Sequence, residues 1–202
     1  MELVIVSGSQ RKDSQTAKVA QYLMQQMLAT HNVKHIELCQ YQLPFWDGDP
    51  ESKNVDGSRW PFIAQQIKRA DALVLITPEW GGMASPLIKN FLLMCDNQET
   101  AHKPALLVSV VSGISGAYPI AELRMNALKN NKLVATPDHL IIRNVAEVLN
   151  QQQPENERDQ HLRERISYCL HMLSQYSDAL TTIRSNHEAM PYPKQQEYSY
   201  GM

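Results

Sequence analysis

Short, uninterrupted apolar runs that alternate with helix-like segments constrain the fold of this chain more than any other feature of its sequence. Four such runs lie at residues 3–6, 72–76, 105–111 and 139–145, and a weaker one lies at 34–38. They lack the polar–apolar alternation of a half-exposed strand, which is typical of strands that helices cover on both faces. The order of strand, helix and strand therefore predicts parallel strands joined by helical crossovers.

Five stretches between and after these runs show the apolar periodicity and the capping signals of α-helices. The clearest start is Ser85, a favourable N-cap residue, because Pro86 follows it and proline suits the first helical position. Ser58 is expected to cap the second helix in the same way. The five helices are expected at about residues 14–28, 57–70, 85–94, 119–130 and 155–184. Together with the five apolar runs they predict an α/β fold of the flavodoxin-like type, a doubly wound five-stranded parallel sheet in a three-layer sandwich.

The length and the composition fit one globular domain. The chain has 202 residues, of which 43% are hydrophobic and 20% are charged, enough for one sizeable core and too few for two ordinary domains. We assign residues 1–184 to this domain. Residues 185–202 contain two prolines and no helical periodicity, and we expect a C-terminal tail that is either disordered or in contact with a partner subunit.

Several classes of function find no support in the sequence. The formal net charge is −2, which gives no basic surface for nucleic acid. No apolar run approaches the ~18 residues of a membrane span, and the first residues lack the pattern of a signal peptide. Three widely spaced cysteines and seven scattered histidines form no metal motif, and the cysteines suit a reducing compartment. We expect a cytoplasmic protein that binds no nucleic acid, membrane or metal.

The first apolar run ends in "SGSQRKDSQT", residues 7–16, which is rich in hydrogen-bonding side chains. Parallel sheets bind ligands beyond the carboxyl ends of their strands, and the start of a following helix favours an anion. The loop would offer hydroxyl groups and the Arg11 guanidinium, while Gly8 would let the backbone approach the anion closely. An ordinary capped turn explains the same residues. Dinucleotide and P-loop glycine patterns are missing, so a monophosphate fits better than a larger nucleotide.

Two further loops follow the next strong apolar runs. The loop after residues 72–76 contains Pro78 and Trp80 beside two glycines, and the loop after 105–111 reads "SGISGA" from Ser112. The carboxyl ends of parallel strands meet at one edge of a sheet, so these loops and the first one would converge on one crevice. The sequence therefore predicts a ligand site there.

The motifs in these loops resemble those of the NADPH-dependent FMN reductase family, the flavodoxin-like quinone, azo-dye and chromate reductases. "GSQRKDSQT" is similar to the family's phosphate loop, and "TPEWGG" with "SPLIKNFL" is similar to its Thr-Pro-Glu-Tyr-Asn-Gly segment and the helix beyond. "LPFWDGD" and "KPALLVSVVSGISGA" resemble two further family segments in the same order. The likeness covers residues 2–145. Trp80 and Gly81 stand where the family usually has tyrosine and asparagine.

The resemblance implies a bound FMN, NAD(P)H as co-substrate and no catalytic side chain. It implies a small electron acceptor, such as a quinone, an azo compound, a free flavin or a metal oxyanion. It also implies a homodimer or homotetramer with the helix after Ser85 at the interface. The implied cofactor-binding residues are Ser9, Arg11, Ser14, Gln15 and Thr16 around the phosphate, and Pro78, Glu79, Trp80, Gly81, Ser112, Gly113, Ser115 and Gly116 around the isoalloxazine ring.

Three alternatives stay open at this point. The protein could be a flavodoxin-type electron-transfer protein without its own NAD(P)H oxidase activity, although such shuttles tend to be acidic and this chain has 19 basic and 21 acidic residues. It could be a serine hydrolase using Ser115, because residues 113–117 nearly form a nucleophile elbow and Asp138 and His139 follow. It could also be a flavin-free relative, since Gly81 removes a family side chain.

Overall fold

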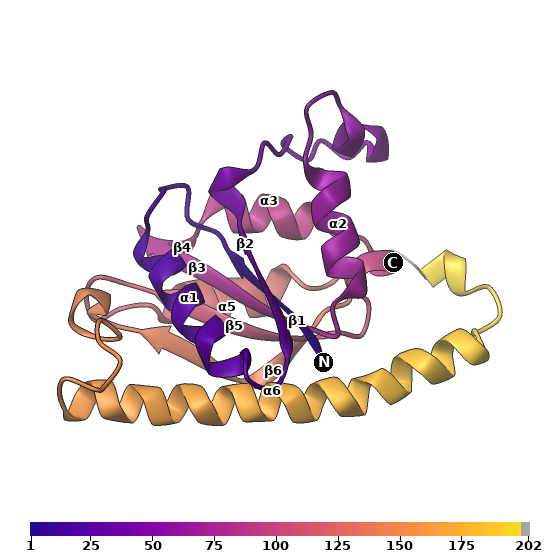
Figure 1. Ribbon diagram of the computed structural model, residues 1–202. Helices are drawn as coiled ribbons and strands as arrows, with labels where there is room; N and C mark the ends of the chain where they lie inside the picture. Colours follow the sequence, from indigo (N-terminus) through magenta and orange to yellow (C-terminus); the bar gives the residue numbers. More distant parts are fainter. Residues whose placement is uncertain (199–202) are drawn as a thin grey trace.

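The computed structural model describes residues 1–198 and shows helices on both faces of a central sheet (Figure 1). The strands are β1 (Glu2–Ser7), β2 (Asn32–Glu37), β3 (Ala72–Trp80), β4 (Met83–Ala84), β5 (Pro104–Val110) and β6 (Val134–Ile142). Five of them form a parallel sheet in the order β2-β1-β3-β5-β6, and the short β4 pairs antiparallel with β3. This order is that of flavodoxin-like sheets, so the predicted fold class is confirmed.

The helices form the two outer layers of the sandwich. They are α1 (Gln15–Met27), α2 (Trp60–Arg69), α3 (Pro86–Met94), α4 (Asn97–Thr100), α5 (Ala117–Asn126) and α6 (Glu157–Ala189), with 3-10 turns at Leu38–Gln40, Pro50–Asn54, Val145–Glu147 and Gln195–Tyr198. In β1, Leu3 and Ile5 join the core under α1 and α6, whereas Val4 and Val6 join the core under α2, α3 and α5. Because successive strand residues point to opposite faces, both faces need apolar residues, and the runs are therefore continuous.

Of the two predicted N-caps, Ser85 and Ser58, the first is confirmed and the second is displaced by one residue. Ser85 is the N-cap of α3, and its Oγ accepts a hydrogen bond from Ile88 N at 3.2 Å. At α2 the cap position belongs to Arg59 instead of Ser58, although the Ser58 hydroxyl still accepts a bond from Trp60 N. The fourth helix begins and ends earlier than expected, at 117 and 126, since the Asn131 amide bonds the Ala127 carbonyl and the chain turns toward β6.

The last strand also differs from its prediction. It covers 134–142 in place of 139–145, because pairing with β5 begins at Val134 and the chain leaves the sheet near Asn144, whose φ is +45°. Pro137 has no N–H to donate, which argues against a strand at this point of the sequence. Because β6 is an edge strand, proline is tolerated there.

The C-terminal helix α6 lies along the face of the sheet that α1 also covers and continues past the sheet (Figure 1). It runs to Ala189, so the first residues of the predicted tail, from 185, belong to the helix. Beyond it, Lys132 Nζ donates to the Tyr198 carbonyl at 2.6 Å, which places this part of the tail against its own chain. A partner contact of residues 185–202 stays a prediction, and residues 199–202 lie outside the described residues. None of the helices within 1–198 combines the length and the apolarity that crossing a bilayer requires.

Candidate functional site

A crevice opens where the loops after β1 and β3 diverge, at the point where the strand order reverses. Its volume is about 390 Å³, within the range of roughly 300–1,000 Å³ that is typical of small-molecule sites. Ligands of open α/β sheets bind at such switch points. The lining residues are Ser9, Arg11, Lys12, Asp13, Ser14, Gln15, Thr16, Pro78, Glu79, Trp80, Val110, Ser112 and Val145.

The start of α1 forms one wall of the crevice. Ser14 is its N-cap, with Oγ accepting from Ala17 N at 3.1 Å, and its carbonyl accepts from Lys18 N at 3.1 Å. The N–H groups of Gln15 and Thr16 precede these bonds and have no acceptor within the helix. The first turn contains no acidic residue, so the positive end of the helix dipole is not neutralised by its own side chains.

Two cations stand beside these free N–H groups. Arg11 and Lys12 are exposed, and neither forms a salt bridge with any residue of 1–198. Ser9 is buried beneath them, and its hydroxyl accepts from Arg11 N at 3.1 Å, which leaves the Ser9 proton free to donate. The donor set of hydroxyls, helix N–H groups and a guanidinium is one that suits a phosphate group.

Gly8 packs closely against the start of α3. A Cβ added at this position would lie 2.6 Å from the Ile88 Cβ and 3.3 Å from the Ile76 carbonyl oxygen. The Ser85 hydroxyl also donates to the Gly8 carbonyl. This glycine therefore permits the close approach of α3 to the first loop. A close approach of an anion to the Gly8 backbone stays a prediction.

The second wall is a β-hairpin, which was not predicted from the sequence. Strands β3 and β4 are joined by Gly81 and Gly82, whose φ values are +59° and +79°. Two residues with positive φ form a type I′ turn, for which a Gly-Gly pair is a known signal. Asparagine tolerates this conformation better than most residues, so glycine and the family's asparagine fit the same turn. Gly81 lies at the turn and does not line the crevice.

The third loop contributes less to the lining than predicted. Ser112 lines the crevice, but Gly113, Ser115 and Gly116 do not. The Ser115 hydroxyl donates to the Glu79 carboxylate and so ties this loop to the hairpin. Gly116 is the N-cap of α5 with φ +101°, and a Cβ there would collide with Ile141. Its role is therefore to let the chain turn into α5.

Four lining residues were not predicted: Lys12, Asp13, Val110 and Val145. Lys12 and Asp13 lie inside the motif that carries the resemblance, yet no side-chain role was assigned to them. Val110 was read as a strand residue and Val145 as the end of one. Their positions in the sequence could have identified them, since residues at or just past the carboxyl end of a central strand lie at this edge of the sheet.

Two titratable groups behind the first loop, His35 and Cys39, have shifted pKa values that favour their neutral forms. Ser7 Oγ and His35 Nε2 are 2.8 Å apart, and burial lowers the pKa of His35, which keeps the imidazole neutral near pH 7. The Cys39 thiol lies 3.6 Å from the Arg11 carbonyl, and burial together with Glu37 raises its pKa. The charges at the crevice are therefore those of its own lining, Arg11 and Lys12 beside Asp13 and Glu79, together with the positive end of the α1 dipole.

The residues of a serine hydrolase are not assembled. Ser115 bonds Glu79, and its backbone carbonyl accepts from Arg143 Nε at 2.9 Å. His139 lies back along β6, opposite Leu107, and Asp138 pairs with Arg165 at 2.7 Å. No hydrogen bond within residues 1–198 joins Ser115 to His139, so the structure gives this alternative no support.

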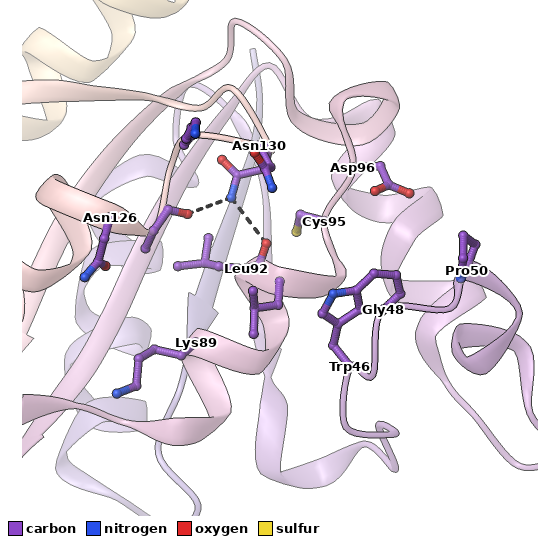
Figure 2. A pocket seen from close by; sticks show the side chains of 13 residues that line it. Trp46, Gly48, Pro50, Lys89, Leu92, Cys95, Asp96, Asn126 and Asn130 are labelled. Atoms are coloured by element: carbon purple, nitrogen blue, oxygen red, sulfur yellow. Dashed lines mark hydrogen bonds between the residues drawn. The ribbon is translucent and has the colours of Figure 1, made fainter. Parts of the chain in front are cut away.

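A larger cavity, of about 670 Å³, lies beside the C-terminal halves of α3 and α5 (Figure 2). Both helices run away from the crevice, so this cavity lies toward the amino-terminal ends of β5 and β6. Trp46 stands on one side, Asn126 on the other and Leu92 between them. Three charged residues line it: Lys89 and Asp96, which are paired with Glu122 and Lys53, and Lys129. None of the predicted site residues lines it, so the smaller crevice is the candidate site that matches the prediction. Within residues 1–198 no group of three potential metal ligands occurs.

Comparison with known proteins identifies the family to which this crevice belongs. The family model for NADPH-dependent FMN reductase matches residues 1–147. The chain belongs to the NADPH-dependent FMN reductase family. All three crevice loops fall within the matched region, and the family predicted from the loop motifs is confirmed.

Curated relatives of this family member are reductases. An NADPH azoreductase of Bacillus sp. (strain OY1-2) is 30% identical over 116 residues, which make up 57% of this chain and 62% of the relative. A quinone reductase of Pseudomonas putida is 28% identical over 120 residues, or 57% of this chain and 63% of the relative. The match therefore spans less than two thirds of either relative.

Solved structures agree on the fold. The flavoenzyme NAD(P)H:(acceptor) oxidoreductase of Paracoccus denitrificans superposes with a TM-score of 0.68 at 19% identity, covering 90% of this chain and 97% of that one. The apo form of an NADH:FMN oxidoreductase gives a TM-score of 0.64 at 20% identity, covering 83% and 87%. Nearly the whole architecture, including much of the region beyond residue 147, is thus shared.

Proposed function

We propose that this protein binds FMN in the crevice and is an NAD(P)H-dependent oxidoreductase that reduces small-molecule acceptors. One observation carries the proposal: the start of α1, the hydroxyl-rich loop and the two cations Arg11 and Lys12 face one crevice at the switch point of a flavodoxin-like sheet. Membership of the family supplies the cofactor and the reductant that such a site would use.

The donor set assigns the phosphate end. Ser9, Ser14 and Thr16 would donate their hydroxyl protons, and Arg11 would add a charge-assisted bond. Gln15 would contribute its backbone N–H at the helix start. Since the Ser14 oxygen already accepts from Ala17, its proton remains available to the phosphate.

The remaining lining suits the flat ring system. Pro78, Trp80, Val110 and Val145 provide apolar surface, and Glu79 and Ser112 provide polar edges. FMN, when bound, supplies the capacity to take a hydride from NAD(P)H and to pass electrons to an acceptor. The protein is left to position the ring and exclude water, and no side-chain acid, base or nucleophile is assigned. Gly81, Gly113, Ser115 and Gly116 would shape the loops that border the ring.

The acceptor class follows from the relatives. They are named azoreductase and quinone reductase, so a quinone or an azo compound is the acceptor that we propose. A crevice that opens to solvent between loops would admit such molecules after the nicotinamide leaves.

We also propose a homodimer or homotetramer with α3 at the interface, in the cytoplasm. Leu93 on α3 is 58% exposed, and the large apolar side chains of Phe45 and Met125 are exposed as well. Exposed large apolar side chains of this kind are typical of subunit contacts. Cys39, Cys95 and Cys169 are free, which suits a reducing compartment.

The visible absorption spectrum and FMN titration test the cofactor. The purified protein should show a flavin band or gain one with FMN, and it should oxidise NADPH or NADH when menadione or methyl red is added. Binding of FMN without any NAD(P)H oxidation would favour an electron-transfer protein of the flavodoxin type. No flavin band and no binding on titration would overturn the proposal.

The variant Arg11→Ala tests the phosphate end separately. Loss of one charge-assisted bond should weaken FMN binding by roughly tenfold or more and leave riboflavin nearly unchanged. An equal loss for both flavins would remove the phosphate role of Arg11. Arg59→Ala is the matched control. Like Arg11, which lies 5.3 Å from the centre of the Trp80 ring, Arg59 lies over an aromatic ring, that of Phe62, but it lines no part of the crevice.

A further inference from the structure

A cation–π contact crosses the crevice from one loop to the other. The Arg11 guanidinium carbon lies 5.3 Å from the centre of the Trp80 ring. Arg11 comes from the loop after β1 and Trp80 from the end of β3, and both line the crevice. Arg11 has no salt bridge within the described chain, so this ring is the group that holds its head.

The two partners differ in how firmly they are held. Trp80 is a strand residue, paired with Met83 across the Gly81–Gly82 turn. The hairpin is fixed from the side, because Ala84 N donates to Glu122 Oε2 at 2.7 Å and Ser85 N donates to Thr77 Oγ1 at 2.9 Å. Arg11 is exposed on a loop and has a long flexible side chain. Trp80 is therefore the rigid partner, and its ring determines where the Arg11 guanidinium lies.

Placing the guanidinium in advance changes the cost of ligand binding. A free arginine side chain loses rotamer freedom when it is immobilised on an anion. Tryptophan is the strongest cation–π partner among the aromatic residues, so it holds the guanidinium better than the family's tyrosine would. The Arg11 side chain then loses its rotamer freedom when the protein folds, before a phosphate binds.

We propose that Trp80 is a positioning residue that holds the Arg11 guanidinium at the phosphate end of the crevice, and that this contact makes the site select FMN over unphosphorylated riboflavin. The inference rests on the proposed function, because it takes FMN as the ligand. It assigns Trp80 an effect on the phosphate, although the residue borders the ring end and carries no charge.

Dissociation constants for FMN and for riboflavin, measured by quenching of flavin fluorescence, test this role without any activity assay. Trp80→Leu should weaken FMN binding about fivefold more than riboflavin binding, the scale of an exposed cation–π contact. Trp80→Phe, which keeps an aromatic face, should restore most of the preference. Trp80→Val keeps strand propensity and replaces the leucine variant if that one does not fold.

Two comparisons separate positioning from general damage. Trp46→Leu removes another tryptophan with a cation over its ring, Lys53 at 4.7 Å, but outside the crevice, and it should leave the FMN-to-riboflavin ratio unchanged. In an Arg11→Ala background, Trp80→Leu should no longer change that ratio, since the group that it positions is gone.

The outcomes are distinct. If the wild-type protein binds FMN but Trp80→Leu weakens both flavins equally, or if the losses of the two single variants simply add, the positioning role is wrong and the proposed function stands. If the wild-type protein binds neither flavin, the proposed function and this inference both fail.

Discussion

The contact between Gly8 and α3 makes one substitution especially informative. In Gly8→Ala the new methyl group would lie 2.6 Å from the Ile88 Cβ, 3.1 Å from Ser85 Oγ and 3.3 Å from the Ile76 carbonyl oxygen. Carbon atoms in contact normally lie about 3.5–4.0 Å apart, so the first loop or the start of α3 has to move by roughly 1 Å. Because a Cβ is fixed to its backbone, no rotamer change at Ile88 relieves the contact.

Overpacking of this kind costs about 1–3 kcal/mol. For a chain of 202 residues that corresponds to a decrease in Tm of roughly 2–12 °C. Urea unfolding followed by circular dichroism measures the free energy of unfolding. FMN titration measures any loss of FMN affinity, since the loop that we propose to bind the phosphate begins at this residue. We expect both to fall.

Gly113→Ala is the matched control. A Cβ at Gly113 has no atom within 4 Å, and its φ is not in the left-handed region. Both variants lower the entropy of the unfolded chain equally, so this effect cancels in the comparison. If Gly8→Ala unfolds at the same urea concentration as Gly113→Ala, α3 does not depend on the absent side chain and the packing interpretation is wrong.

Three further predictions concern side chains elsewhere in the fold. Asp159 is buried, and although burial opposes its ionisation, hydrogen bonds from Arg163 and two backbone N–H groups lower its pKa. Asp159→Asn should therefore lower the free energy of unfolding in urea by about 3 kcal/mol. The stability that the carboxylate confers should be lost as the pH falls below 3.8. Burial lowers the pKa of Lys103 from 10.5 to about 8, so the folded state releases its proton first. The free energy of unfolding should therefore rise between pH 8 and 10.5 relative to Lys103→Met, by up to about 3 kcal/mol. A flat difference across that window would contradict the shift. Ser14→Ala should cost about 1 kcal/mol through the lost N-cap; Ser14→Asp should keep the cap but weaken FMN binding, and equal FMN affinity in both variants and the wild type would place the phosphate elsewhere.

The layered fold could be predicted because its causes are local in the sequence. Buried strands with helices on both faces need apolar residues at every position, and the run at 72–76 shows this without any tertiary information. The Ser85–Pro86 start of α3 is equally local. Two elements were not recoverable in this way. The hairpin after β3 depends on pairing between two strand ends, and Pro137 hid the first half of β6 because its tolerance there depends on the edge position.

The site was predictable in its loops and less so in its individual residues. Motif order and strand ends were enough to bring Arg11, Trp80 and Ser112 to one crevice. The roles of the glycines were harder to predict, since a glycine in the sequence does not show which neighbouring group excludes a side chain there. At Gly8 the neighbour that excludes the side chain is a helix about 80 residues away in sequence, and no local pattern reveals it.

The bonds between the loops determine how the crevice responds to a ligand. The Ser85 hydroxyl joins the hairpin to the first loop, and Ser115 joins the third loop to Glu79 of the hairpin. The three loops around the crevice are thus linked to one another as well as to the sheet. Entry of a flavin then requires little ordering of the protein, so its binding should be accompanied by a small change in amide hydrogen exchange at these loops. A mutation in one loop, by the same linkage, alters the other two, and exchange of loops between relatives will succeed only when all three are moved as a set.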